Sequence, residues 1–230
     1  MSVCVIHPRA SKKSASKLAL ALKADCVNPY HSKVRDFRKY DVVFNYGCSL
    51  PVKANSIINK PWAVEQCVSK TQAYDLLHAA GVPTVKYTRH KDKVPKDWKV
   101  VVCRKEEFGH SNDGLVMIHQ GDKLPEAAYY SEYYKHKFEF RIVVYKNKVL
   151  ARYIKKENDD GEWEFIHLEP AGFEAIDAAT IKAAKALGID YAGLDIIAKN
   201  QEDFRVLEAN SGPIITDDVL TILKKEFANV

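Results

Sequence analysis

The sequence predicts an α+β chain with a small α/β unit in front of it, on the strength of two observations. The first sixty residues alternate short apolar strand and helix patterns, which is typical of a small, largely parallel sheet with its helices. After residue 63, strands and helices follow in mixed order, which favours α+β over a doubly wound sheet. We therefore expect two domains, residues 1–62 and 63–230.

In the N-terminal unit, strands are expected at residues 3–6 and 41–45, on either side of a helix at 11–24. Pro61 marks the expected end of this unit. A well-signalled helix follows, because Ser69 and Gln72 have the spacing of a capping box and Gly81 and Pro83 have the order of a helix stop. Its apolar stripe is formed by Ala73, Leu76, Leu77 and Ala80.

The remainder is rich in strands up to residue 153, including a hairpin that turns at residues 146–148. A helix at 177–187 ends in Gly188. A second hairpin pairs residues 193–199 with 204–210, and a closing helix begins after Thr216. This order of elements completes the α+β prediction.

Charge is distributed unevenly along the chain. The formal net charge is +5, yet residues 1–62 carry +8 and residues 63–230 carry −3. With 47% hydrophobic residues, collagen-like, low-complexity and globally disordered classes are excluded. The basic surplus suggests a polyanionic partner for the N-terminal unit, although charge runs are more often solvated faces. The residues that could form such a surface are Lys12, Lys13, Lys17, Arg35, Arg38 and Lys39.

Cysteines and the first residues indicate the compartment. The five cysteines are odd in number, widely spaced and without a Cys-x-x-Cys pair, so a disulfide framework or zinc site is not expected. The first residues resemble a strand and not a signal peptide, and no segment approaches the roughly 20 apolar residues of a membrane span. We expect a cytoplasmic protein with reduced thiols and no membrane contact.

The C-terminal hairpin carries the most informative chemical pattern. If its turn is centred between residues 201 and 202, Asp195 lies directly opposite Glu208, and Asn210 follows on the same face. The opposite face then holds apolar pairs, Leu194 with Ala209 and Ile196 with Leu207.

Two carboxylates directly opposite each other repel, so a cation is expected between them. Together with the amide they offer three hard oxygen ligands, which suit Mg²⁺ with waters and phosphates as its remaining ligands. We therefore predict a metal site at Asp195, Glu208 and Asn210, with Mn²⁺ as an alternative metal.

The pattern Asp-x12-Glu-x-Asn within GLDII and VLEANSGP resembles the metal-binding signature of the ATP-grasp superfamily. The resemblance covers residues 60–215 and extends to the RimK-like branch of carboxylate–amine ligases. It implies an ATP-grasp fold, in which two α+β subdomains grip Mg-ATP, after a smaller α/β domain.

The resemblance also implies which residues contact the nucleotide phosphates. Lys70 is similar to the family lysine on the phosphates, although a cation is disfavoured in the first turn of a helix. Arg104 follows a strand that resembles the one whose basic residue contacts the α- and β-phosphates, and arginine binds phosphate bidentately. The loop 109–114 resembles the glycine-rich phosphate lid, which implies contacts from His110 and Ser111.

Residues 132–139 resemble the segment that holds the adenosine. Glu132 and Glu139 have the family spacing of an adenine hinge, whose backbone contacts the purine edge, followed by the acid that binds the ribose hydroxyls. Tyr133 and Tyr134 belong to the implied hinge.

Two further basic residues are implied to be catalytic. Arg141 shares the face of Glu139 on the same strand, and the RimK-like branch has a similar acidic-x-Arg pattern. Lys155 matches a basic position that contacts the γ-phosphate and the intermediate, with Arg152 and Lys156 as alternatives.

The implied function is an ADP-forming C–N ligase that phosphorylates a carboxylate and then joins it to an amine. The expected substrates are small-molecule or peptide carboxylates and amines. One alternative is ligation of an amino acid or amine onto a modified nucleotide or an acidic acceptor held by the basic N-terminal unit. A second alternative is a non-catalytic ATP-binding regulator.

Overall fold

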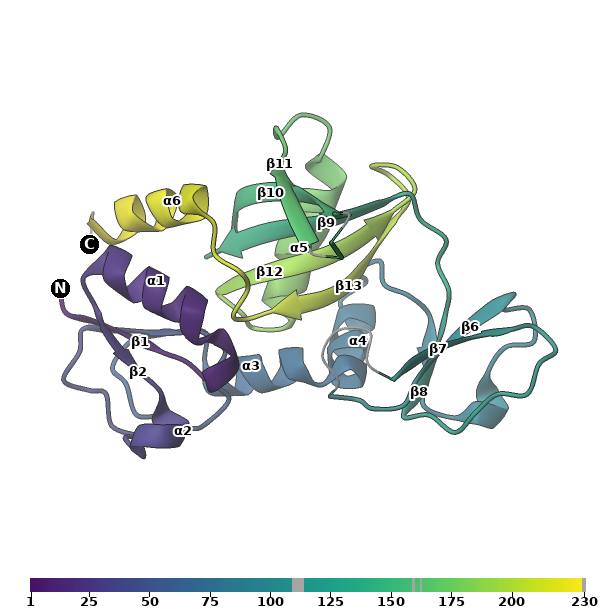
Figure 1. Ribbon diagram of the computed structural model, residues 1–230, viewed down its shortest axis with the longest axis horizontal. Coiled ribbons are helices and arrows are strands. Elements are labelled where there is room, and N and C mark those ends of the chain that lie inside the picture. Colours follow the sequence, from purple (N-terminus) through teal and green to yellow (C-terminus); the bar gives the residue numbers. More distant parts are fainter. Residues whose placement is uncertain (109–113, 159, 162, 229–230) are drawn as a thin grey trace.

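In the computed structural model, residues 1–108, 114–158, 160–161 and 163–228 are described, and they form three sheets with helices between them (Figure 1). The first sheet belongs to the N-terminal part and is parallel, in the order β2-β1-β3-β4. Its strands are β1 (Val3–Ile6), β2 (Asp25–Val27), β3 (Val42–Asn45) and β4 (Ile57–Ile58). The parallel α/β unit expected for the first sixty residues is therefore confirmed.

Three short helical segments accompany this sheet: η1 (Arg9–Ser11), α1 (Lys12–Leu22) and α2 (Pro29–Ser32). The short strands β2 and β4 and the one-turn helix α2 were not predicted, since two to four residues carry little periodicity. Pro61, expected to end the unit, is the first residue of a further unpredicted helix, α3 (Pro61–Val68). Proline is well placed there because the first helical N–H has no partner within the helix.

Ser69 ends α3 and begins α4 (Lys70–Ala79). Its hydroxyl accepts a hydrogen bond from the N–H of Gln72 at 3.4 Å, as the capping pattern predicts. The reciprocal half of the capping box does not form, because the N–H of Ser69 donates to the carbonyl of Glu65. One serine therefore ends the first helix and caps the second.

The second sheet has five antiparallel strands in the order β11-β10-β9-β12-β13. Its strands are β9 (Phe138–Tyr145), β10 (Lys148–Glu157), β11 (Trp163–His167), β12 (Tyr191–Ala198) and β13 (Phe204–Asn210). The β9–β10 hairpin turns through Lys146 and Asn147, which both have positive φ, as in the two-residue turns that match strand twist. The edge strand β11 was not predicted.

The third sheet is smaller and antiparallel, in the order β5-β8-β6-β7. Its strands are β5 (Tyr87–Thr88), β6 (Val100–Arg104), β7 (Leu115–His119) and β8 (Tyr129–Glu132), with the short helix η2 (Lys91–Lys93) between β5 and β6. Two helices complete the described elements, α5 (Glu174–Ala186) and α6 (Asp217–Ala228). Helix α5 begins three residues before the predicted start at 177.

The two faces of the five-stranded sheet are covered differently. One face packs against α3, α4 and α5 in a core that includes Ile142, Leu194 and Ile176. On the other face, Val143 and Tyr191 share a core with the N-terminal sheet, α1 and α6. Helices α1 and α6 accordingly lie side by side although they come from opposite ends of the chain (Figure 1).

The remaining part of that second face is open and carries the site described below. The boundary at residue 62 stays a prediction. All five cysteines are free thiols, and four of them are buried. No helix within the described residues is long and apolar enough to span a membrane.

Candidate functional site

A cleft of about 900 Å³ lies where the open face of the five-stranded sheet meets α4 and the end of β6. Many of the residues singled out from the sequence line it, although they come from six different elements. These residues are Lys70, Arg104, Glu139, Arg141, Lys155, Asp195, Glu208 and Asn210.

The β12–β13 hairpin pairs its polar residues as predicted. Asp195 lies opposite Glu208, Leu194 lies opposite Ala209, and Asn210 follows Glu208 at the end of β13. The amide of Asn210 donates to the carboxylate of Glu208 at 2.9 Å, so the two side chains share the cleft face.

The predicted pairing of Ile196 with Leu207 is wrong. The register shifts after Asp195, and Ile196 pairs with Val206, which leaves Leu207 as the extra residue of a β-bulge. Val206 is in the core beneath the sheet, whereas Leu207 and Glu208 both line the cleft. The bulge therefore changes which face the alternate residues of β13 occupy, and it adds an apolar residue to the cleft.

The two acids are compensated by basic residues of the chain itself. The guanidinium of Arg141 donates to both carboxylate oxygens of Asp195, at 2.6 Å each, and the ammonium of Lys155 lies 3.2 Å from the same carboxylate. Lys70 forms an ion pair with Glu208. Acids suited to a metal and cations suited to phosphates thus contact one another directly.

The donor set fits a hard divalent cation. Two carboxylates and an amide oxygen from adjacent strands are the ligands that Mg²⁺ prefers, with waters and phosphates to complete its shell. Within the described residues, no cluster of three or more His, Cys, Asp or Glu side chains offers a second candidate site. Binding at Asp195, Glu208 and Asn210 stays a prediction.

Lys70 is the first residue of α4 and is largely buried. Burial lowers the pKa of its ammonium to about 8, and the nearby Arg104 guanidinium acts in the same direction, whereas Asp195 opposes it. Because burial disfavours the charged ammonium, an anion that approaches Lys70 stabilises its protonated form.

The geometry distinguishes Lys155 from its two alternatives. Arg152 points to the other side of the strand and forms an ion pair with Asp177 of α5. Lys156 is exposed and does not line the cleft, whereas Lys155 does. Lys155 therefore remains the predicted contact to the γ-phosphate.

Of the predicted adenosine segment, Glu139 lines the cleft, whereas Glu132, Tyr133 and Tyr134 do not. Glu132 is the last residue of β8, and Tyr133 is partly exposed next to it. The hydroxyl of Tyr134 donates to the carboxylate and carbonyl of Asp203, which ties the hinge to the β12–β13 turn. Glu139 lies 3.5 Å from Lys155. His110 and Ser111 lie outside the described residues.

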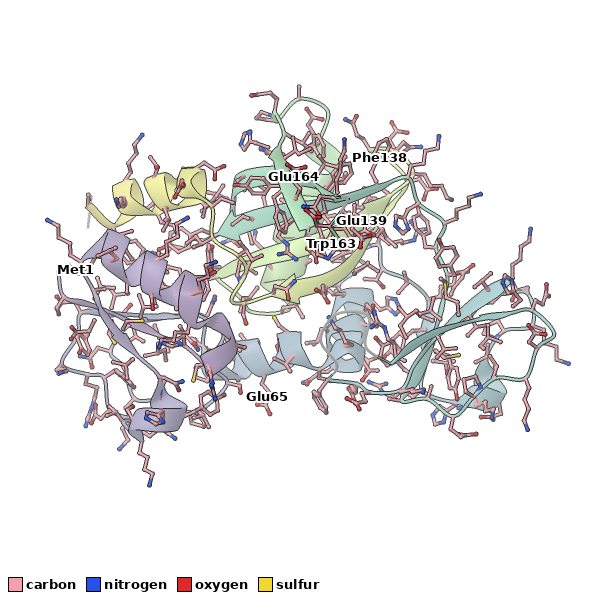
Figure 2. The ribbon with its side chains drawn as sticks, in the orientation of Figure 1. Met1, Glu65, Phe138, Glu139, Trp163 and Glu164 are labelled. Atoms are coloured by element: carbon pink, nitrogen blue, oxygen red, sulfur yellow. The ribbon has the colours of Figure 1, made fainter. Side chains whose placement is uncertain are left out.

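Aromatic side chains from β11 line the cleft and were missed by the sequence reasoning. Lys155 lies over the ring of Trp163, 4.6 Å from its centroid, and the Arg141 guanidinium lies 5.1 Å from that of Phe165. Figure 2 shows Trp163 and Glu139 near each other, on β11 and β9. The alternation in WEFIH was a usable signal, because every second residue is aromatic.

Comparison with known proteins was made by family, by sequence and by structure. No protein-family model matches the chain. Beta-citrylglutamate synthase B of Danio rerio is 26% identical over 181 residues, covering 67% of this chain and 44% of that relative. The chain thus spans less than half the length of this curated relative.

Two solved structures extend the likeness over the whole chain. The ATP-grasp ligase PsnB, solved with a minimal precursor, Mg and ADP, has a TM-score of 0.74 at 13% identity, covering 99% of this chain and 96% of that one. D-alanine–D-alanine ligase from Bacillus anthracis has a TM-score of 0.65 at 15% identity, covering 100% and 92%. The chain has the ATP-grasp fold, and the superfamily resemblance that its motifs indicated is confirmed at the level of the fold.

Proposed function

We propose that the protein is an ADP-forming ligase that joins a carboxylate to an amine with the energy of ATP. The observation that carries this proposal is the single cleft in which Asp195 and Glu208 meet Arg141, Lys155 and Lys70 on an ATP-grasp fold. Both solved structures compared above are ligases, and the PsnB structure contains Mg and ADP.

In this proposal Asp195, Glu208 and Asn210 hold a magnesium ion, which neutralises phosphate charge when bound. Lys70 and Arg104 contact the phosphates. Glu139, which also lines the cleft, binds the ribose.

The reaction has two steps, and protein groups form no covalent bond in either. A carboxylate oxygen of the substrate attacks the γ-phosphorus of ATP, the bond to ADP breaks, and an acylphosphate forms. The amine nitrogen then attacks the acyl carbon, phosphate leaves with the bonding electrons, and the nitrogen releases its proton. Arg141 and Lys155 orient the carboxylate and stabilise the charge that spreads over the transferred phosphoryl group.

A finer proposal concerns the acceptor. Arg38 and Lys17 of the basic N-terminal surface are paired with Asp36 and Asp217. Lys12 and Lys13 are exposed in the first turn of α1, which contains no acid, and within the described residues they form no ion pair. These two lysines favour an acidic acceptor.

Neutralising Lys12 and Lys13 should raise the KM for an acidic acceptor without changing the KM for ATP. The increase in KM should be smaller at high salt concentration.

The test is Mg²⁺-dependent ADP release from ATP across a panel of carboxylic acids and amines, followed by mass spectrometry of the product. Glu208→Gln should abolish ADP release, whereas Glu202→Gln, an exposed acid in the turn of the same hairpin, should leave it unchanged. ADP release that persists in Glu208→Gln would overturn the metal assignment. ATP binding without turnover on any substrate pair would favour the non-catalytic regulator.

A further inference from the structure

Lys70 stands where its own helix disfavours a positive charge. It is the first residue of α4, at the positive end of the helix dipole, and the first turn of α4 contains no acidic residue. The acids that approach this turn come from other parts of the chain. Glu208 meets the Lys70 ammonium from β13, and Glu107 approaches the same turn from the segment after β6.

The Glu107 carboxylate contacts the residues on both sides of Lys70. Its Oε1 atom accepts hydrogen bonds from the hydroxyl of Ser69, at 2.5 Å, and from the hydroxyl of Thr71. Ser69 and Thr71 are both buried, so these hydroxyls have little access to water. The two hydrogen bonds hold the pKa of Glu107 below its ordinary value, so the carboxylate is ionised at neutral pH.

Glu107 also follows Arg104 by three residues in the chain. Arg104 lines the cleft from the end of β6, and Glu107 then joins the segment to the start of α4. Residues 104–107 therefore contribute one proposed phosphate contact, Arg104, and support the backbone that carries the other, Lys70.

We propose that Glu107 is a positioning residue for nucleotide binding, which holds Lys70 in the cleft by fixing the hydroxyl groups on either side of it. The inference rests on the proposed function, because it requires ATP phosphates beside Lys70. It assigns no contact between Glu107 and the nucleotide. Its effect passes entirely through the first turn of α4.

The experiment measures the Kd of Mg-ATP by titration calorimetry. Glu107→Gln should weaken binding about tenfold, the loss expected for a charge-assisted hydrogen-bonded pair. The matched control is Glu106→Gln, the same change at the exposed neighbouring residue, which should alter the Kd less than about twofold.

A double-mutant cycle with Lys70→Met separates positioning from general loss of structure. If Glu107 acts through Lys70, Glu107→Gln should change the Kd less than about twofold in the Lys70→Met background. Equal losses in both backgrounds would overturn the inference, as would wild-type affinity in Glu107→Gln. A wild-type protein that binds no Mg-ATP would instead overturn the proposed function. Should Glu107→Gln fail to fold, Thr71→Val removes one of the two hydroxyl donors and keeps the Ser69 cap of α4, and it should weaken Mg-ATP binding in the same direction.

Discussion

Two halves of one sheet face differ sharply in this protein. On the open half, the cleft face carries four charged side chains, Glu139, Arg141, Lys155 and Asp195, beside the aromatic rings of β11. On the covered half, the same strands present Val143, Tyr145, Ala151 and Tyr191 to the N-terminal unit. Along β9 the change takes two residues, from Arg141 to Val143. The site is thus the place where a shared hydrophobic core stops, on the same strands that carry it.

The loop after Asn210 lies at the boundary between the two halves, which we call the seam. The hydroxyl of Tyr46, in the N-terminal unit, donates to the carbonyl of Pro213. A Cβ atom on Gly212 would lie 2.8 Å from the hydroxyl of Ser11 and 3.1 Å from the carbonyl oxygen of Tyr46, so a larger residue would make these neighbours shift. The N-terminal unit therefore contacts the loop that begins at a predicted metal ligand.

The largest expected effect comes from the charged half. Asp195→Ala should reduce ADP release at least about a thousandfold, because it removes a proposed metal ligand. It should also lower the free energy of unfolding by roughly 3 kcal/mol, since Arg141 and Lys155 lose their shared buried partner. Turnover and urea unfolding measure the two effects. Wild-type turnover in this variant would contradict the assignment of activity to the charged half, because Asp195 would then be purely structural.

A substitution in the covered half should lower stability and leave nucleotide binding unchanged. Val143→Ala removes two methyl groups from a side chain that is 2% exposed, and it should lower the free energy of unfolding by about 2 kcal/mol. The Kd of Mg-ATP should stay within about twofold of wild type at temperatures where the variant is folded. A marked loss of nucleotide affinity with unchanged stability would show that the two halves are not distinct.

A smaller effect is expected at the seam. Tyr46→Phe removes one buried hydrogen bond and leaves the carbonyl of Pro213 without it, so the free energy of unfolding should fall by about 1 kcal/mol. The comparison variant is Tyr30→Phe, whose hydroxyl bonds Ser49 at an exposed position and should change stability less than about 0.5 kcal/mol. Equal stability changes in the two variants would remove the case for a specific seam contact.

The smallest effect concerns pH. The folded pKa of Glu107 lies below its ordinary value of 4.5, because Ser69 and Thr71 hydrogen-bond its ionised form. Its contribution to stability is therefore present above pH 4.5 and is lost as the pH falls through the lowered value. Thermal unfolding should show Glu107→Gln less stable than wild type at pH 7, with the difference shrinking below pH 4.5. A difference that stays constant across this range would contradict the contribution of an ionised carboxylate.

The hairpin shows how far sequence reasoning extends and where it fails. The predicted pairing of Asp195 with Glu208 is confirmed, but the register next to the turn is one residue away from the predicted one, with Ile196 opposite Val206. The bulge at Leu207 restores the predicted register at Asp195. The bulge was not predicted, and it lies beside a contact with a segment that is distant in the chain. The N–H of Val206 donates to the carbonyl of Pro83 at 2.8 Å, and Thr84 forms a bridge with Val206.

Helix α4 and Glu107 show the same difference between local signals and contacts with distant parts of the chain. Helix α4 was predicted from its Ser69 cap and its stripe, which are local signals. The contacts of Glu107 were not predicted, because nothing in its own segment indicates the hydroxyl groups it meets. The sequence did not decide which of Arg152, Lys155 and Lys156 faces the cleft. In the structure Arg152 forms an ion pair with α5, on the side of the sheet away from the cleft.

The direct pairing of cleft acids with cleft cations has a thermodynamic consequence. A divalent cation alone would bind to acids whose counter-charges are then left without partners, and a metal-free nucleotide would do the reverse to the cations. The metal–nucleotide complex satisfies both sets at once, exchanging each internal ion pair for an external one. We therefore expect positive linkage, in which each component raises the affinity for the other.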